Sequence, residues 1–240
     1  MNKTSTRLVF AVDGGSMTIN DVMKQERDAL LGESVVSEKL FVGGWLPYAA
    51  VTDPEILVRT PGFLRSKHPV TIEGLPGRDR SMAFVEVCPS LRHTFLWVHA
   101  DNDDYRSDYR NFLRTIHQVR EDLPETIHVD HLYNRDRAKQ FQTPFIRLVL
   151  CTQRINSSHG AGYEKRRGAR GLGRLGRDHT MDEITLMKLC GVSSPKKGKP
   201  LTPEIMSHIQ TVAGLHGMRI EEITSIIKDL MDVADFVPRR

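Results

Sequence analysis

The sequence contains few cysteines and no long apolar run. Only three cysteines occur in 240 residues, at Cys88, Cys151 and Cys190, and no two of them form a CxxC pair. Their wide spacing and odd number argue against a zinc ribbon and against a disulfide framework, and they favour a reducing setting. No stretch approaches the ~20 consecutive apolar residues that a membrane span needs, so no membrane partner is expected.

A secretory signal peptide and internal repeats are also not apparent. The apolar run near the N-terminus, from Leu8 to Val12, is too short for a signal peptide. We therefore expect a cytoplasmic protein, although export by a route without such a signal would leave no mark in the sequence.

The overall composition is that of a soluble protein with a core of useful size. Hydrophobic residues make up 39% and charged residues 27% of the chain, an ordinary balance for a globular protein. The net charge is +4 and the isoelectric point about 9.0. Because this excess of positive charge is small, its position along the chain matters more than its sum.

The first two thirds of the chain alternate between strand-like and helix-like segments. Helices are predicted at 21–32 and 103–121, the second with the acidic run "DNDD" at its start as a cap. The strand-like segments are rich in Val, Phe and Ile and are bounded by Gly, Pro, Asp or Asn; they are 7–12, 82–87, 94–99, 126–131 and 145–151. The pair 82–87 and 94–99 can form a hairpin. We expect an α/β or α+β domain with a mixed sheet over residues 1–164.

A basic, glycine-rich segment follows this region. Between residues 165 and 177 the chain has four glycines and no acidic residue, and its basic residues are Lys165, Arg166, Arg167, Arg170, Arg174 and Arg177. Such a segment cannot bury a core, so residues 165–178 are predicted to link two domains. The same residues can follow a phosphate backbone, which makes nucleic acid an expected partner; a purely soluble linker is the alternative.

The remainder of the chain, 179–240, is predicted to be a small all-helical domain. "TMDE" at 180–183 matches a capping box, and Thr202 with Pro203 matches another helix start. A helix-turn-helix interpretation is disfavoured because the helix that would enter the major groove begins with Glu221 and Glu222. A helical hairpin that binds a protein partner fits these charges better.

The stretch "IHVDHLYNRDRA", residues 127–138, contains the strongest candidate for a functional site. In a strand, His128 and Asp130 point to one face, and His131 lies at the strand's exit. A polar loop leads to the strand 145–151, after which a helix can begin near Asn156 and bring His159 to the same end. The expected order is therefore strand, loop, strand, helix.

This arrangement resembles the HNH, or ββα-metal, endonuclease motif over about residues 126–165. The resemblance implies that Asp130 holds a divalent metal ion and that His131 is the general base that activates water. Asn156 and His159 would complete the metal site from the helix. An imidazole that is neutral near pH 7 can take a proton from water, and oxygen ligands suit Mg²⁺ or Mn²⁺. Arg135, Arg147 and Arg154 would contact phosphates, together with the basic segment.

The same residues also fit a structural interpretation. Asp130 is an acceptable helix cap, His128 suits a hydrogen-bonded core position, and His159 can simply face solvent. Asn134 stands only three residues after His131, close for the asparagine that orients the catalytic histidine in the family.

The sequence alone therefore leaves two functions open. The first is a metal-dependent nuclease of HNH-like type that cleaves DNA or RNA. The second is a non-catalytic adaptor or effector that binds a protein partner through its C-terminal helices and nucleic acid through its basic linker.

Overall fold

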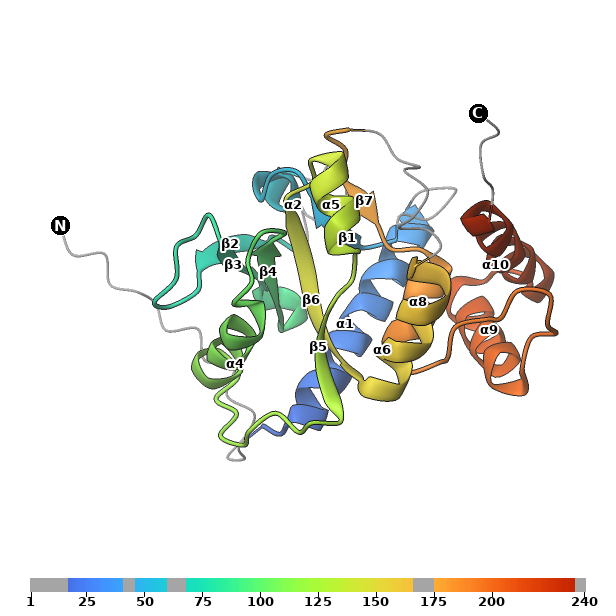
Figure 1. Ribbon diagram of the computed structural model, residues 1–240, viewed down its shortest axis with the longest axis horizontal. Helices are drawn as coiled ribbons and strands as arrows, with labels where there is room; N and C mark the ends of the chain where they lie inside the picture. Colours follow the sequence, from blue (N-terminus) through green and yellow to red (C-terminus); the bar gives the residue numbers. More distant parts are fainter. Residues whose placement is uncertain (1–16, 41–45, 60–67, 166–174, 236–240) are drawn as a thin grey trace.

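A curled antiparallel sheet forms the centre of the computed structural model, which describes residues 17–40, 46–59, 68–165 and 175–235 (Figure 1). All of its strand pairs are antiparallel. The strands are β1 (Tyr48–Val51), β2 (Thr71–Gly74), β3 (Ala83–Cys88), β4 (His93–His99), β5 (Ile127–His131), β6 (Phe145–Thr152) and β7 (His179–Thr180). The structure confirms the mixed helix-and-strand fold class, but the described strands form an antiparallel sheet and not the mixed sheet that was predicted. The segment 7–12, predicted as a strand, lies outside the described residues.

Eight α-helices accompany the sheet in the described part of the chain. They are α1 (Ile19–Leu40), α2 (Glu55–Arg59), α4 (Tyr105–Thr115), α5 (Arg135–Phe141), α6 (Gln153–His159), α8 (Glu183–Leu189), α9 (Pro203–His216) and α10 (Ile220–Asp235). A short 3₁₀ turn, Pro89–Leu91, joins β3 to β4, and a π-helical turn, Gly160–Glu164, extends α6. No helix in the described ranges combines the length and the apolar character that crossing a bilayer requires.

Strand β6 connects the two parts of the sheet. The strand order is β2-β3-β4-β6-β1-β7, and β5 also pairs with β6. The first residues of β6, up to Arg147, pair with β4 and β1. From Leu148 to Thr152 the strand pairs with β5 instead. The candidate site on β5 is therefore attached directly to the central strand.

The hairpin predicted from 82–87 and 94–99 is confirmed as β3 and β4. All six residues of β3 are buried, as are the first six of β4. Because successive side chains in a strand point to opposite faces, the hairpin contributes to two separate cores. Phe84 and Trp97 lie in one core, and Val85 and Leu96 lie in the other.

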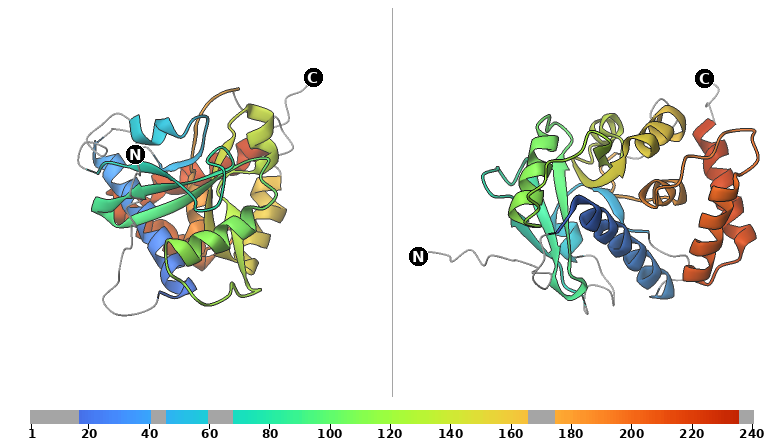
Figure 2. Two further views of the ribbon diagram at one scale, coloured as in Figure 1. Left: turned by 90° about the vertical axis from the view of Figure 1, so that its left-hand side faces the viewer. Right: turned by 90° about the horizontal axis from the view of Figure 1, so that it is seen from below.

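The helices form layers on either side of the sheet. Seen from below, α4 covers one face, α1 lies on the other with α6 and α8 beside it, and α9 and α10 form the outermost layer (Figure 2). On α4 the side chains of Tyr109, Phe112 and Leu113 are buried against the sheet. Their spacing of three and four residues is the pattern that predicted this helix.

The predicted separate helical domain over 179–240 is not confirmed. Strand β7 pairs with β1, so the sheet itself includes residues from this part of the chain. One hydrophobic cluster runs from Leu30 of α1 and Phe84 of β3 to Ile209 of α9 and Ile227 of α10. The apolar faces of the C-terminal helices are thus buried on the rest of the molecule, not only on one another.

Two of the predicted helix starts also differ. The cap of α8 is Asp182, whose carboxylate accepts hydrogen bonds from the backbone N–H and the hydroxyl of Thr185; Thr180, the predicted cap, belongs to β7. Asp104 precedes α4 but makes no side-chain capping bond. The predicted cap at Thr202 is confirmed, with its hydroxyl accepting from the N–H of Ile205.

Glu26 of α1 is a buried acid that joins three elements. One carboxyl oxygen contacts the hydroxyl of Tyr109 on α4, and the other accepts the backbone N–H of Leu150 on β6 at 2.9 Å. Burial raises the pKa of Glu26 to about 8, although the hydrogen bonds from Tyr109 and Leu150 act in the opposite direction. The protonated carboxyl is therefore the main form at neutral pH.

We predict that Glu26→Gln removes a pH dependence of stability. Because the pKa is raised on folding, the contribution of Glu26 is greatest below the unfolded pKa and is lost as the pH rises through 8. A glutamine side chain can contact the same two groups without ionising, with its oxygen accepting the N–H of Leu150 and its amide N–H donating to the hydroxyl of Tyr109. Between pH 6 and pH 9 the wild-type protein should lose about 2–3 kcal/mol of stability that the variant retains, as measured by urea unfolding. The exposed Glu125→Gln is the control, and equal losses in both variants would contradict the prediction.

Candidate functional site

The residues of the HNH-like motif lie in a unit made of β5, β6 and α6. The predicted order of strand, loop, strand and helix is present, with β5 and β6 paired antiparallel. Helix α6 begins three residues before Asn156, because the hydroxyl of Thr152 caps the N–H of Ile155. The connecting loop contains a further short helix, α5, whose cap is Asn134. Asn134 therefore starts a helix and does not orient His131.

Asp130, the predicted metal ligand, forms an ion pair with Lys188 of α8. The ammonium nitrogen of Lys188 lies 2.5 Å from one Asp130 carboxylate oxygen and 2.6 Å from a carboxylate oxygen of Glu164. The Lys188 side chain is only 2% exposed and that of Asp130 only 13%. A single cation thus joins the strand β5, the turn after α6 and the helix α8. We call Asp130, Glu164 and Lys188 the lysine cluster.

The lysine cluster keeps its ammonium charged. Burial alone would lower the pKa of Lys188, but the carboxylates of Asp130 and Glu164 outweigh this effect and raise it above its ordinary value. Burial raises the pKa of Glu164, and the positive charge of Lys188 opposes that rise. Because the ammonium lies against a carboxylate oxygen of Asp130, a divalent cation would have to displace it to bind that oxygen.

His131, the predicted general base, packs against an aromatic ring. Its imidazole lies 4.4 Å from the ring centre of Tyr105, and it makes no hydrogen bond through the buried nitrogen Nε2. Burial lowers the pKa of His131 to about 4, partly opposed by the carboxylate of Asp130. The ring is neutral at pH 7, as a base must be. Its free nitrogen, however, is enclosed by protein and not open to a water molecule.

The two helix residues of the motif also have other partners. The amide of Asn156 faces Nδ1 of His128 at 3.2 Å. His159 is 1% exposed, and its Nε2 lies 2.9 Å from the carbonyl oxygen of Val192. A carbonyl can only accept a hydrogen bond, so this nitrogen carries the proton and has no lone pair for a metal.

These contacts do not fit the magnesium or manganese site that the resemblance implies. Within the described ranges, no three side chains of His, Cys, Asp or Glu are placed so that they could hold a metal ion. Asp130 holds an ammonium group, and Asn156 and His159 hold neighbouring side-chain and backbone groups.

Arg147, predicted to contact phosphate, is instead part of the core. It is 0% exposed, and its guanidinium lies 2.9 Å from Glu86 and 3.6 Å from Glu33. The same group stacks over the rings of Phe95 and Trp97. No phosphate can reach it in this structure, and the prediction for this residue is corrected. On a strand flanked by two layers, an arginine that finds carboxylates and aromatic rings can be fully buried.

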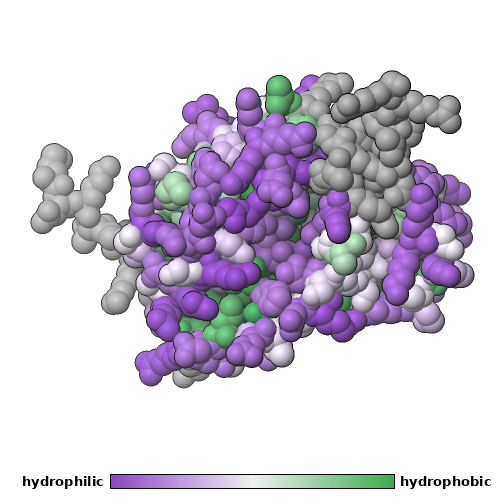
Figure 3. All heavy atoms as spheres, in the orientation of Figure 1, coloured by the Kyte–Doolittle hydropathy of each residue, from purple (hydrophilic) through white to green (hydrophobic). Residues whose placement is uncertain are grey.

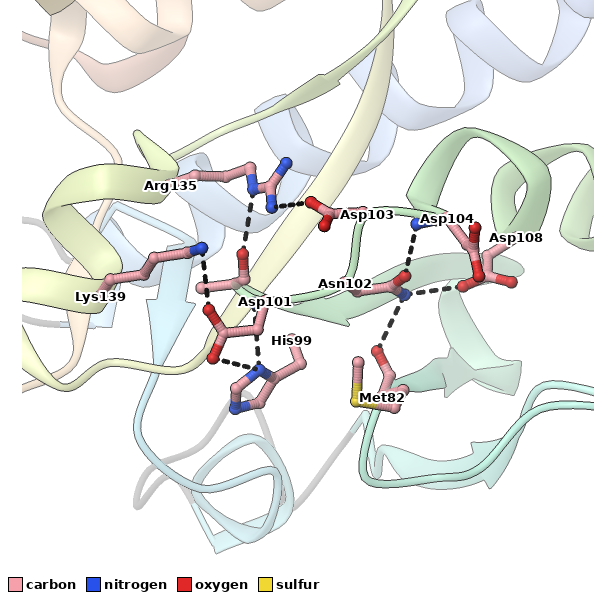
Figure 4. A network of polar contacts seen from close by, with 10 residues as sticks. Met82, His99, Asp101, Asn102, Asp103, Asp104, Asp108, Arg135 and Lys139 are labelled. Carbon is pink, nitrogen blue, oxygen red and sulfur yellow. Dashed lines mark hydrogen bonds and ion pairs between the residues drawn. The ribbon is translucent and has the colours of Figure 1, made fainter.

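Arg135 is held by the acidic loop that precedes α4 (Figure 4). Its guanidinium donates to the carbonyl oxygen of Ala100 at 3.0 Å and to Asp103 at 2.7 Å. Lys139, one turn further along α5, pairs with Asp101 at 2.8 Å. The acidic run thus neutralises the basic face of α5, and Arg135 is not a free phosphate contact.

The other predicted phosphate contacts fall into two groups. Arg154 is exposed, with Ser193 at 2.9 Å and Glu204 at 3.8 Å as neighbours, and Lys165 and Arg177 are also exposed. Arg166, Arg167, Arg170 and Arg174 lie outside the described residues. The described ends of the basic segment are therefore open to solvent.

A further set of basic side chains, which the sequence analysis did not identify, lies on α4. Arg106, Arg110 and Arg114 follow one another at intervals of four and are all exposed. Arg106 and Arg110 border one hollow, and Arg110 and Arg114 border the next. Between α4 and β5 the surface is apolar and has a hydrophilic border (Figure 3). Spacing by four residues in a predicted helix was the signal that could have revealed this row.

Comparisons with known proteins identified no relative of this chain. No protein-family model, no curated protein and no solved structure matches the chain.

We predict that Lys188→Met strongly destabilises the protein and changes its response to pH. The substitution leaves Asp130 and Glu164 facing each other without a cation, which should cost about 3–5 kcal/mol at pH 7. Protonation of either carboxylate relieves the repulsion between them, so lowering the pH to 5 should restore part of the loss. Urea unfolding at the two pH values measures the effect.

Two further variants complete this test. Lys165→Met changes an exposed lysine close by in the sequence and should alter stability by less than about 0.5 kcal/mol. Adding Asp130→Asn to Lys188→Met removes one of the two facing charges and should recover stability at pH 7. A single Lys188→Met variant as stable as the Lys165→Met control would show that the lysine cluster contributes nothing.

Proposed function

We propose that this chain is a non-catalytic adaptor that binds nucleic acid without cleaving it and also binds a protein partner. The observation that carries the proposal is the lysine cluster. An HNH-like nuclease needs the carboxylate of Asp130 to be free to hold a divalent cation. Here that carboxylate forms an ion pair with Lys188, which comes from another part of the chain. The strand–strand–helix unit then serves as a support that anchors α8, and not as a reaction centre.

The surroundings of His131 support the same conclusion. A general base must lie within hydrogen-bonding reach of the water that it activates. The imidazole of His131 packs at a tilt against the ring of Tyr105, and its unpaired Nε2 is buried. No described acceptor orients that ring as the family's asparagine would, since Asn134 caps α5.

Two features support affinity for nucleic acid. The basic segment 165–177 has six positive charges and no negative one, and glycines between the arginines allow them to follow a phosphate backbone. On α4, Arg110 makes no ion pair with any described residue, whereas the neighbouring Arg114 pairs with Asp122 at 3.1 Å. Contacts of this kind recognise phosphates and not base sequence, so the binding should be non-specific.

A metal-dependent nuclease is the second candidate, because the order and pairing of β5, β6 and α6 match the motif. For catalysis, Lys188 would have to leave Asp130 and the buried Nε2 of His131 would have to become accessible to water. The two functions give opposite results in a cleavage assay.

We predict that the wild-type protein binds DNA and RNA but cleaves neither with Mg²⁺ or Mn²⁺. Binding, measured by fluorescence anisotropy, should weaken steeply with salt, because each phosphate neutralised contributes a slope of about −0.9 in a plot of log K against log salt concentration for duplex DNA. Replacing Arg166, Arg167, Arg170 and Arg174 by Gln should reduce that slope and weaken binding to all sequences equally.

The control for cleavage is His131→Ala, incubated with plasmid DNA beside the wild-type protein. Metal-dependent product from the wild-type protein that disappears in His131→Ala would establish the nuclease and refute the adaptor. Failure of the wild-type protein to bind any nucleic acid at low salt would remove that part of the proposal.

A further inference from the structure

A groove with an apolar floor lies between α9, α10 and the loop that precedes α9. Its volume is about 510 Å³. The floor consists of Leu201, Met206, Ile227 and Met231, which are buried or half-buried. Methionine side chains adapt their shape to different apolar partners, and such residues are common on surfaces that bind peptides.

A tight turn places lysines along one side of this groove. The N–H of Lys199 donates to the carbonyl oxygen of Lys196 at 3.1 Å, and Gly198, the third residue of the turn, has φ of +66°. A turn of this kind needs a residue that tolerates positive φ at its third position, which glycine provides. Lys196, Lys197 and Lys199 are thereby held at the rim, and all three are exposed.

Helix α10 forms the opposite wall. Thr224, Lys228 and Asp232 occur at intervals of four and line the groove, while Ile227 on the adjoining face is buried. Among the described residues that line the groove, the charged ones are four lysines, at 196, 197, 199 and 228, and the acid Asp232. The groove thus combines an apolar floor with a rim that is strongly positive.

We infer that this groove binds an acidic segment of a protein partner, one that inserts apolar side chains between its carboxylates. The inference rests on the proposed adaptor function, and it names the surface and the chemistry of the protein partner. Apolar side chains would fill the floor, and carboxylates would pair with Lys199 and Lys228 across the opening.

The composition of the groove favours a peptide over a nucleic acid. Single-stranded nucleic acids are held by aromatic side chains on which the bases stack, and none of the described residues that line this groove is aromatic. Its lysines attract carboxylates and phosphates alike, but Met206 and Met231 offer contacts that only apolar side chains use well. Selectivity for acidic segments with apolar residues is the consequence that an experiment can measure.

The test uses the full chain and three fluorescent probes. The first is a short synthetic peptide of Asp, Glu and Leu, with leucines at helical spacing. The second has Ser in place of each Leu, and the third is a single-stranded oligonucleotide of the same net charge. We expect saturable binding of the first peptide in the micromolar range and at least about tenfold weaker binding of the second, since each tenfold change corresponds to ~1.4 kcal/mol.

Matched pairs of lysine variants locate the binding surface. Lys199→Gln with Lys228→Gln should weaken binding of the leucine peptide about three- to tenfold, because two rim charges are lost. Lys24→Gln with Lys139→Gln, at exposed lysines that do not line the groove, should leave it unchanged. Oligonucleotide binding should be the same in the Lys199/Lys228 variant as in the wild-type protein.

Three outcomes would overturn the inference. They are the absence of saturable peptide binding, equal weakening in both lysine pairs, and an oligonucleotide that binds more tightly than the leucine peptide and loses affinity in the Lys199/Lys228 variant. The first two leave nucleic-acid binding by the wild-type protein intact, so failure of the groove and failure of the proposed function can be told apart.

Discussion

The buried ammonium group of Lys188 joins the C-terminal part of the chain to the sheet, and it also limits what the HNH-like motif can do. Lys188 lies between Asp130 and Glu164, and through them α8 is joined to β5 and to the end of α6. Ion pairs at the surface contribute little, but removing one member of a buried pair leaves a charge without compensation. The contact therefore ties the C-terminal part of the chain to the sheet, and it also uses the carboxylate that a metal would need.

Two other buried ionisable side chains, Arg147 and Glu26, are stabilised in the core in different ways. The guanidinium of Arg147 is fully buried. It forms an ion pair with Glu86 and lies over the rings of Phe95 and Trp97. Glu26 has no cation as close, and its pKa rises to about 8, so that the neutral acid bridges α1, α4 and β6. Pairing and protonation are the two ways in which a buried ionisable group avoids an isolated charge. Residues of these types invite a catalytic interpretation in a sequence, whereas here they hold layers together.

Local patterns predicted much of the fold, and long-range pairing set the rest. Alternation and turn residues were enough for the β3–β4 hairpin and for the order of β5, β6 and α6, and the cap at Thr202 followed from its neighbours. The role of Asp130 could not be found in this way, because its partner Lys188 lies on a helix far along the chain. Nothing in "DHLYN" distinguishes a carboxylate that awaits a metal from one that meets a lysine. The packing of the C-terminal helices on the rest of the molecule could not be predicted for a similar reason. A basic segment looks like a domain boundary, although apolar residues beyond it belong to the same hydrophobic cluster as Leu30 of α1.

The burial of the Lys188 ammonium is tested most directly by NMR of the protein labelled with ¹⁵N at the lysine Nζ positions. If the lysine cluster forms in solution, one ammonium signal should show slow proton exchange with water and remain charged to a higher pH than the exposed lysines. Its assignment should be confirmed by its disappearance in a Lys188 variant. A Lys188 signal that exchanges as fast as those of the surface lysines, or that titrates with them, would contradict the account.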